Sequence, residues 1–296
     1  MNHETKRARF FMIISMTVFG TLGLFVRNIP LPSGELALYR AVMAAVLLGG
    51  YLLFSKQHIP FADMKREIWI LFLSGAAMGM NWILLFEAYQ YTTVSIATLS
   101  YYFAPVIVTV ICPILFHERL TRKQVLCFIL STVGLILITV TKRSGSGTKT
   151  DFIGILFGLG AAVFYAAVIL LNKFIKTVDG IHRTFLQFLS AIAVLIPYVL
   201  LSGGMHLDHL NGNFVGWISL LIVGFLHTGV TYCLYFSSLK VLSGQKAAIL
   251  SYIDPLIAIL VFVVFLHETM TALQLIGGLL ILGFTLWNEL GKDESV

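Results

Sequence analysis

Ten long apolar segments dominate this chain, and each is close to the roughly 20 residues that an α-helix needs to cross a bilayer. They cover residues 10–27, 34–55, 68–90, 95–116, 122–141, 152–172, 183–201, 215–239, 244–266 and 271–290. Only 11% of the 296 residues are charged and 58% are apolar, whereas a soluble domain carries about 25% charge. The pattern predicts an all-α integral membrane protein of about ten transmembrane helices, because lipid removes the need to cover apolar surface.

Lysine and arginine are distributed unevenly between the two sets of connections. If the N-terminus is cytoplasmic, 15 of the 20 Lys and Arg residues lie on the cytoplasmic side. The positive-inside rule then places both ends of the chain in the cytoplasm, and an even number of spans independently requires both ends on one side. We therefore expect a multi-pass protein of the plasma (inner) membrane with both termini cytoplasmic.

The chain contains an internal repeat. Two 24-residue stretches, starting at Tyr101 and Ser251, align without gaps at an offset of 150 and share seven identities, five of which form the pattern P-x11-H-E-x2-T-x2-Q. Because each half then holds an odd number of spans, consecutive copies must enter the membrane in opposite orientations, as in secondary transporters. We predict two inverted five-helix repeats around a central cavity, at residues 1–143 and 151–296, joined by a Gly/Ser-rich linker at 144–150.

The repeated motif also has local interpretations. Thr121 with Gln124, and Thr271 with Gln274, have the spacing of a capping box at the start of spans five and ten. The acidic members of the motif, which end spans four and nine, could form a gate or could act only as turn and anchor residues. These acidic residues are Glu118 and Glu268.

The P-x11-H-E element in both halves is similar to the proline followed by a Gly-Glu or like pair in the EamA family of the drug/metabolite transporter superfamily. The sequence ALYRA at 37–41 resembles the Arg-bearing segment of that family, and the resemblance covers nearly the whole chain. The chain departs from the family at His117 and His267, where Gly is common, and at Glu87, where a small residue is usual. The resemblance implies a ten-helix fold, a cavity lined by both halves, a small-molecule substrate, and peripheral helices five and ten at which some members form homodimers.

Polar residues in the middle of the spans are candidates for the substrate site, because an ionisable residue inside a membrane is costly and points to function. Asp254 and His227 lie near the midplane in spans nine and eight, and Asn81 lies at mid-depth in span three. Asp254 and His227 could bind substrate, couple export to protons, or form a buried structural pair. Pro105 and Pro255 lie at similar depth and are predicted to bend their helices around the cavity.

Two further groups of side chains have the depth and spacing of a cavity wall. One is a polar face of span eight with spacings of four, four and three, which could instead form hydrogen bonds between helices. Its members are His227, Thr231, Tyr235 and Ser238. The other group could contact an apolar or aromatic substrate or only fill the bundle. It comprises Trp82, Tyr101, Phe103 and Tyr165, together with Tyr102 on a polar stripe of span four.

A charged pair is predicted near the outer ends of spans two and three. Arg40 and Glu87 lie at compatible depths, so the sequence predicts an ion pair between them. The pair could be a gate, a clamp for a substrate carboxylate, or a structural bridge. Arg40 alone could also extend to the membrane interface.

The motifs of other functional classes are missing from the sequence. It contains no nucleotide-binding motif, no aspartate-rich or HExxH metal motif, and no CxxC spacing among its cysteines. We therefore expect no cofactor, metal or nucleic-acid partner, and no enzymatic activity. We predict a secondary transporter that moves a small metabolite, an amino acid or related compound, by alternating access in the direction of export. The alternative is an intramembrane enzyme or a channel without a recognisable catalytic motif.

Overall fold

The computed structural model describes residues 3–55, 67–115, 121–140, 148–178, 180–239, 241–242, 250–251, 253–267 and 270–290. The first half contains α1 (His3–Gly20), α2 (Leu22–Val26), α3 (Ser33–Phe54), α4 (Ile68–Tyr91), α5 (Val94–Tyr101), α6 (Ala104–Leu115) and α7 (Arg122–Val140). The second half contains α8 (Thr148–Asn172), α9 (Gly180–Leu201), the short η2 (Leu207–Leu210), α10 (Phe214–Leu221), the π-helix η3 (Ile222–Val230), α11 (Thr231–Leu239), α13 (Ile253–Val264) and α14 (Ala272–Leu290).

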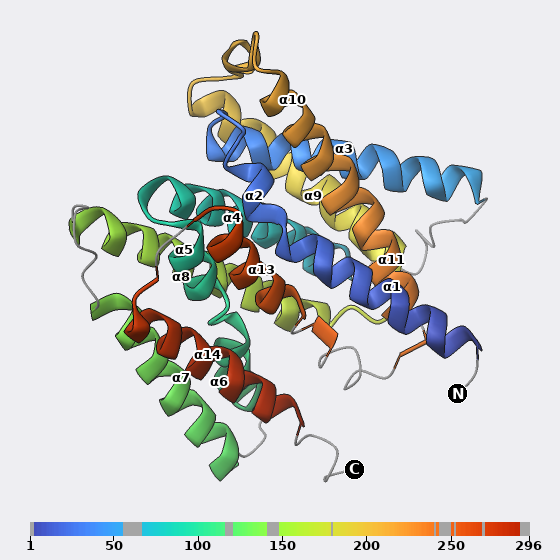
Figure 1. The fold of residues 1–296 in the computed structure, drawn as a ribbon. Coiled ribbons are helices and arrows are strands. Elements are labelled where there is room, and N and C mark those ends of the chain that lie inside the picture. Colours follow the sequence, from blue (N-terminus) through green and yellow to red (C-terminus); the bar gives the residue numbers. More distant parts are fainter. Residues whose placement is uncertain are drawn as a thin grey trace.

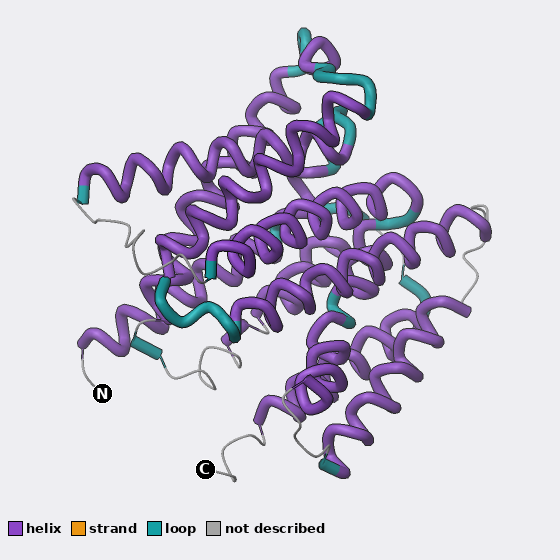
Figure 2. Tube along the Cα trace, turned by 180° about the vertical axis from the view of Figure 1, so that it is seen from behind, coloured by secondary structure: helices purple, strands orange, loops and turns teal. Residues whose placement is uncertain are grey.

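These helices form ten spans within the described ranges, which confirms the predicted all-α fold. Three spans consist of consecutive helices: α1 with α2, α5 with α6, and α10 with η3 and α11. Six spans are apolar and long enough by themselves to cross a membrane. The described start of α1 and the described end of α14 lie on the same side of the bundle (Figures 1 and 2).

The contacts between helices are those of two equivalent halves. α3 packs against η3 in the same way that α9 of the second half packs against α4 of the first. Likewise α4 packs against α8 as α11 packs against α1, and α5 packs against α8 as α13 packs against α1. The two halves therefore interlock about a two-fold relation and do not form separate five-helix bundles, so a site at the centre draws on both.

The predicted capping boxes of the repeated motif are confirmed. The Thr121 N–H donates to Gln124 Oε1 (2.8 Å), and the Gln124 N–H donates to Thr121 Oγ1 (3.2 Å). The Thr271 N–H donates to Gln274 Oε1 (3.0 Å), and the Gln274 N–H donates to Thr271 Oγ1 (3.2 Å). These bonds satisfy backbone donors that the first helical turn leaves free, and so they fix where α7 and α14 begin. Glu118 and Glu268 of the same motif lie outside the described residues.

α7 and α14 cross each other at a side of the bundle away from α3 and α9 (Figure 1). At the crossing a Cβ atom on Gly134 would lie 2.5 Å from the carbonyl oxygen of Gly277, and the reverse contact has the same distance. Backbones approach this closely only where side chains are absent, which is the usual role of small residues between membrane helices.

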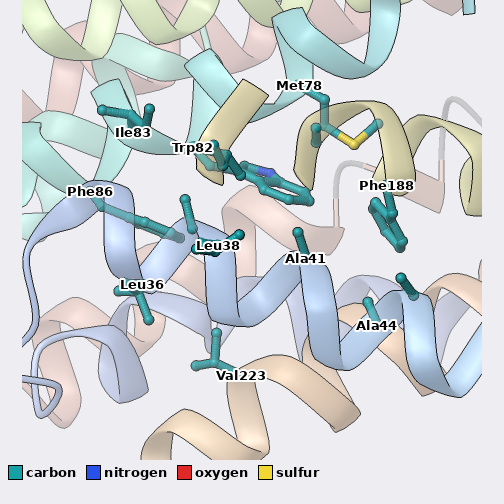
Figure 3. Packing of buried hydrophobic residues seen from close by; sticks show 14 of the residues in the cluster. Leu36, Leu38, Ala41, Ala44, Met78, Trp82, Ile83, Phe86, Phe188 and Val223 are labelled. Carbon is teal, nitrogen blue, oxygen red and sulfur yellow. The ribbon is translucent and has the colours of Figure 1, made fainter. Parts of the chain in front are cut away.

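The largest buried apolar cluster lies between α3, α4, α9 and η3. α3 contributes small buried residues, including Ala41 and Ala44, and these leave room for large rings from neighbouring helices. Figure 3 shows the Trp82 ring above this face of α3, between Phe86 and Phe188. The centroids of Trp82 and Phe188 are 5.7 Å apart. Packing of large rings on small residues therefore joins the two halves next to the centre of the protein.

Glu67, which precedes α4, binds the loop between α8 and α9. Its carboxylate accepts hydrogen bonds from the N–H groups of Lys176 (3.0 Å) and Thr177 (3.1 Å) and from the Thr177 hydroxyl (2.6 Å). Partial desolvation raises the pKa of Glu67, but these hydrogen bonds and the nearby Arg183 outweigh it and hold the pKa below its ordinary value.

We expect Glu67→Gln to destabilise the protein in a pH-dependent manner. Because folding lowers the pKa of this carboxyl, its stabilising contribution is complete above the ordinary value of 4.5 and is lost as the pH falls through the lower value of the folded state. The difference in thermal unfolding midpoint between wild type and variant, measured in detergent, should be full at pH 7 and should shrink below pH 4.5. The exposed Asp208→Asn serves as the control. A difference that stays constant down to pH 4 would contradict this assignment.

Candidate functional site

A cavity of about 120 Å³ lies between the two halves. Seven of the ten spans line it, so neither half forms it alone. A cavity needs a volume of about 10–15 Å³ to hold one water molecule, so this cavity has room for several waters or a small solute. The lining residues are Phe19, Gly20, Leu22, Gly23, Arg40, Asn81, Trp82, Leu85, Tyr89, Thr98, Tyr101, Tyr102, Tyr165, Tyr232, Asp254, Ala258 and Phe262.

One charge in the cavity is Arg40, which lies on α3 and is only 3% exposed. Its Nε donates a 2.6 Å hydrogen bond to Thr228 Oγ1. Its Cζ lies 4.5 Å from the centroid of the Trp82 ring and 5.8 Å from that of Phe86. Stacking on two aromatic faces stabilises a guanidinium in a dry environment and fixes its plane.

The predicted ion pair between Arg40 and Glu87 is wrong. The Glu87 carboxylate accepts a 2.6 Å hydrogen bond from the Ser33 hydroxyl, and Arg40 instead bonds to Thr228. The two residues have compatible depths, but the rotation of each helix about its axis directs their side chains to different neighbours. Stacking on Trp82 directs Arg40 to the cavity.

The second charged residue is Asp254, in the first turn of α13. The Tyr102 hydroxyl donates to its carboxyl at 3.0 Å, a contact between the two halves. Its backbone carbonyl lies next to Gly20, where an added Cβ would come within 2.6 Å. α1 ends at Gly20 and α2 begins at Leu22, so the break in the first span lies directly against Asp254.

Pro105 lies at the start of a helix. α5 ends at Tyr101 and α6 begins at Ala104, so the fourth span is interrupted immediately before Pro105. A proline in the first turn of a helix costs little, because its missing N–H would have no partner there. Pro255 lies in α13, and residues 250–251 shortly before it are also helical.

Aromatic side chains form most of the remaining wall. The ring centroids of Tyr101 and Tyr165 are 5.3 Å apart, and those of Tyr101 and Tyr102 are 5.9 Å apart. These three residues and Trp82 are sequence candidates that the structure brings together in the cavity. Asn81 also reaches the lining, and its Nδ2 donates to the Ala161 carbonyl of α8 at 2.7 Å.

A family model described as the EamA-like transporter family matches the chain twice, at residues 6–140 and 152–288. The chain belongs to this family. A protein named "Uncharacterized transporter YxxF" from Bacillus subtilis is 33% identical over 95% of this chain and 90% of its own length. A "Probable amino-acid metabolite efflux pump" from Salmonella typhimurium is 28% identical over 60% of both chains. A solved crystal structure with 14% identity overlays on 98% of both chains with a TM-score of 0.66, which is a likeness of fold.

Membership of the EamA-like family has direct consequences for this chain. It is a multi-pass membrane protein of a transporter family, and its environment is the lipid bilayer. The family and the names of the relatives indicate a transporter rather than an enzyme. The matched segments also coincide with the two halves that interlock around the cavity, so the cavity of this EamA-like chain lies at the repeat interface, where transporter folds of this kind bind substrate.

The predicted polar face of span eight does not line the cavity. His227 Nε2 lies 2.9 Å from Thr21 Oγ1, Thr231 Oγ1 donates to the Leu226 carbonyl at 2.7 Å, and Tyr235 packs against Phe19. These residues stay on one face of span eight, and that face packs against the first span through Thr21, Ser15 and Phe19. His227 and Asp254 therefore have separate partners, and the buried structural pair considered for them is not formed.

Several residues of the site were missed from the sequence. Thr228 bonds to Arg40, and Tyr232 and Tyr89 line the cavity, together with Thr98 of the polar stripe predicted for span four. Tyr89 and Thr98 are also joined by a 3.2 Å hydrogen bond between their hydroxyls. The clustering of tyrosine in the spans was a usable signal, since five of the lining residues are tyrosines.

Proposed function

We propose that this EamA-like protein is a secondary transporter that exports a small metabolite, an amino acid or related compound, across the plasma membrane by alternating access. The observation that carries the proposal is the cavity between the halves, which contains Arg40 and Asp254 within an otherwise mainly aromatic wall. Charged residues at this depth are retained at substrate or ion pathways. The Salmonella relative named as an amino-acid metabolite efflux pump supports the substrate class and the direction of transport.

The arrangement of the halves supports alternating access. The cavity is bounded by helices from both repeats, so a change in the angle between the halves would alter access to it from each side. In this proposal both termini are cytoplasmic, as the distribution of Lys and Arg favours.

Counterflow in proteoliposomes tests the proposal. Vesicles that contain the purified protein are loaded with a concentrated mixture of unlabelled amino acids and diluted into trace labelled amino acids. We expect the label to accumulate transiently above equilibrium, because a carrier exchanges solutes whereas a channel only equilibrates them. Protein-free vesicles are the control. Equilibration without an overshoot, in the presence of uptake, would indicate a channel and would refute alternating access.

A further inference from the structure

We propose that the cavity binds a zwitterion, whose carboxylate pairs with Arg40 on α3 and whose ammonium group pairs with Asp254 on α13. This inference rests on the proposed transport function and specifies which two groups of the substrate are recognised and by which half of the protein.

The first argument is the state of Arg40. Its guanidinium is buried and retains its positive charge at all relevant pH values. Among the described residues no carboxylate lies within ion-pair distance, and Nε bonds only to the neutral Thr228 hydroxyl. Two aromatic rings stack on it but supply no counter-charge. A buried unpaired charge is costly, so its counter-ion must come from the cavity that Arg40 lines.

The geometry of Arg40 indicates a planar anion. Because Nε is used by Thr228 and the faces are covered by Trp82 and Phe86, the terminal N–H groups are the donors that remain. Two parallel N–H groups of a guanidinium match the two oxygens of a carboxylate. Thr228 lies on η3, where its Oγ1 also donates to the Val223 carbonyl five residues earlier. The π-helix thus positions the residue that orients Arg40.

The second argument is the state of Asp254. Within the part of the chain that the structure describes, its carboxyl accepts one side-chain hydrogen bond, from Tyr102, and forms no ion pair. Tyr101 and Tyr165 line the same cavity. A carboxylate beside tyrosine faces suits an ammonium group, which interacts favourably with both.

Arg40 and Asp254 belong to different halves, line one cavity and are not paired with each other. A solute with one charge would neutralise only one of them, whereas a zwitterion neutralises both. The substrate would therefore bridge the two halves when bound.

The test compares each amino acid with two derivatives that each lack one charge. The probes are L-serine, L-serinamide and N-acetyl-L-serine, and the corresponding L-phenylalanine series, with ligand-induced stabilisation of the purified protein in detergent as the measure of binding. We expect one of the free amino acids to bind wild type at least about 30-fold more tightly than its amide or its N-acetyl form, since loss of one partner of a buried charge pair has an effect of this size.

Variants assign each charge to a residue. Arg40→Gln should weaken binding of the free amino acid until it equals that of the amide. The variant protein should still bind the N-acetyl form less tightly than the free amino acid. Asp254→Asn should show the reverse pattern. The exposed Arg27→Gln and Asp208→Asn are matched charge controls and should bind as wild type does. If Arg40→Gln does not fold, Arg40→Lys retains the charge without the bidentate geometry, and Asp254→Asn tests the second half independently.

Thr228 is assigned as a positioning residue. Thr228→Val should raise the KM for the free amino acid by about tenfold with little change in maximal rate, since a hydrogen bond to a charged group has an effect of about this size. Thr228→Ser should restore the wild-type KM. Thr132→Val on α7, whose hydroxyl bonds within its own helix, is the control for loss of a threonine hydroxyl.

Equal binding of the free amino acids and their derivatives, or absence of binding in both series, would overturn the zwitterion proposal. Variants that weaken the binding of all three members of a series to the same extent would also overturn the proposal. Counterflow of a solute with no charge or a single charge would refute the zwitterion site and leave the proposed transport function standing. Selective binding of the free amino acid without counterflow would support the zwitterion site and refute the proposed transport function.

Discussion

Trp82→Ala is expected to reduce both stability and transport severely. The Trp82 ring is 4% exposed and lies on the alanine face of α3, between Phe86 and Phe188 (Figure 3). Truncation of a buried Trp leaves a cavity and costs about 3–5 kcal/mol of unfolding free energy. It also removes the ring that stacks 4.5 Å from Arg40 Cζ. Loss of a desolvated cation–π contact corresponds to about a tenfold loss in the affinity that Arg40 supports.

The measurement for Trp82→Ala combines thermal unfolding in detergent with exchange in proteoliposomes. Trp82→Phe keeps an aromatic face for Arg40 and should recover most of the exchange, with an intermediate stability. Trp217→Ala is the matched control, because Trp217 is 38% exposed and lies on α10 outside the cavity lining. If Trp82→Ala and Trp217→Ala had the same unfolding midpoint, the packing role of Trp82 would be disproved.

Gly277→Leu is expected to separate α7 from α14. A Cβ at Gly277 would lie 2.5 Å from the Gly134 carbonyl oxygen and 2.9 Å from Ile138 Cγ1. The obstacle at Gly134 is backbone, which no change of side-chain rotamer can relieve, so the helices must move apart along the crossing. Overpacking typically costs about 1–3 kcal/mol of unfolding free energy. Because this variant also loses close contact along two spans, we expect its cost at the upper end of that range.

Gly283→Leu on the same helix provides the control for Gly277→Leu. An added Cβ at Gly283 meets no atom within 4 Å, so this change should leave the unfolding midpoint close to that of wild type. Gly134→Leu should reproduce the effect of Gly277→Leu, since each glycine faces the carbonyl of the other. Equal midpoints for Gly277→Leu and Gly283→Leu would show that the crossing does not contribute to stability.

The fold followed from the sequence because its determinants are local or periodic. Long apolar segments give the spans, and the motif around Thr121 and Thr271 gives both the repeat and the capping boxes. The odd number of spans in each half then requires inversion. None of these steps needs knowledge of how one helix is rotated against another.

The site was only partly predictable for that same reason. Depth along a helix can be counted from the sequence, and it placed Asp254, Asn81 and the tyrosines at the level of the cavity. The rotation of a helix about its axis cannot be read from the sequence. For this reason Glu87 was predicted as the partner of Arg40, whereas Arg40 stacks on Trp82. For the same reason, spacing alone placed His227, Thr231 and Tyr235 on one face but could not show that this face packs against the first span.

The break in the first span has a consequence for the relative energies of the two end states of a carrier. α1 and α2 are interrupted at Thr21, whereas the equivalent span of the second half, α8, is a continuous helix from Thr148 to Asn172. For a carrier that alternates by exchanging the conformations of its halves, α8 would have to bend where it has no interruption. We therefore expect the two end states to differ in energy even without a gradient. Such a protein has an intrinsic resting side, and its half-saturation concentration for the solute would differ between the two faces of the membrane, although the two fluxes stay equal at equal concentrations.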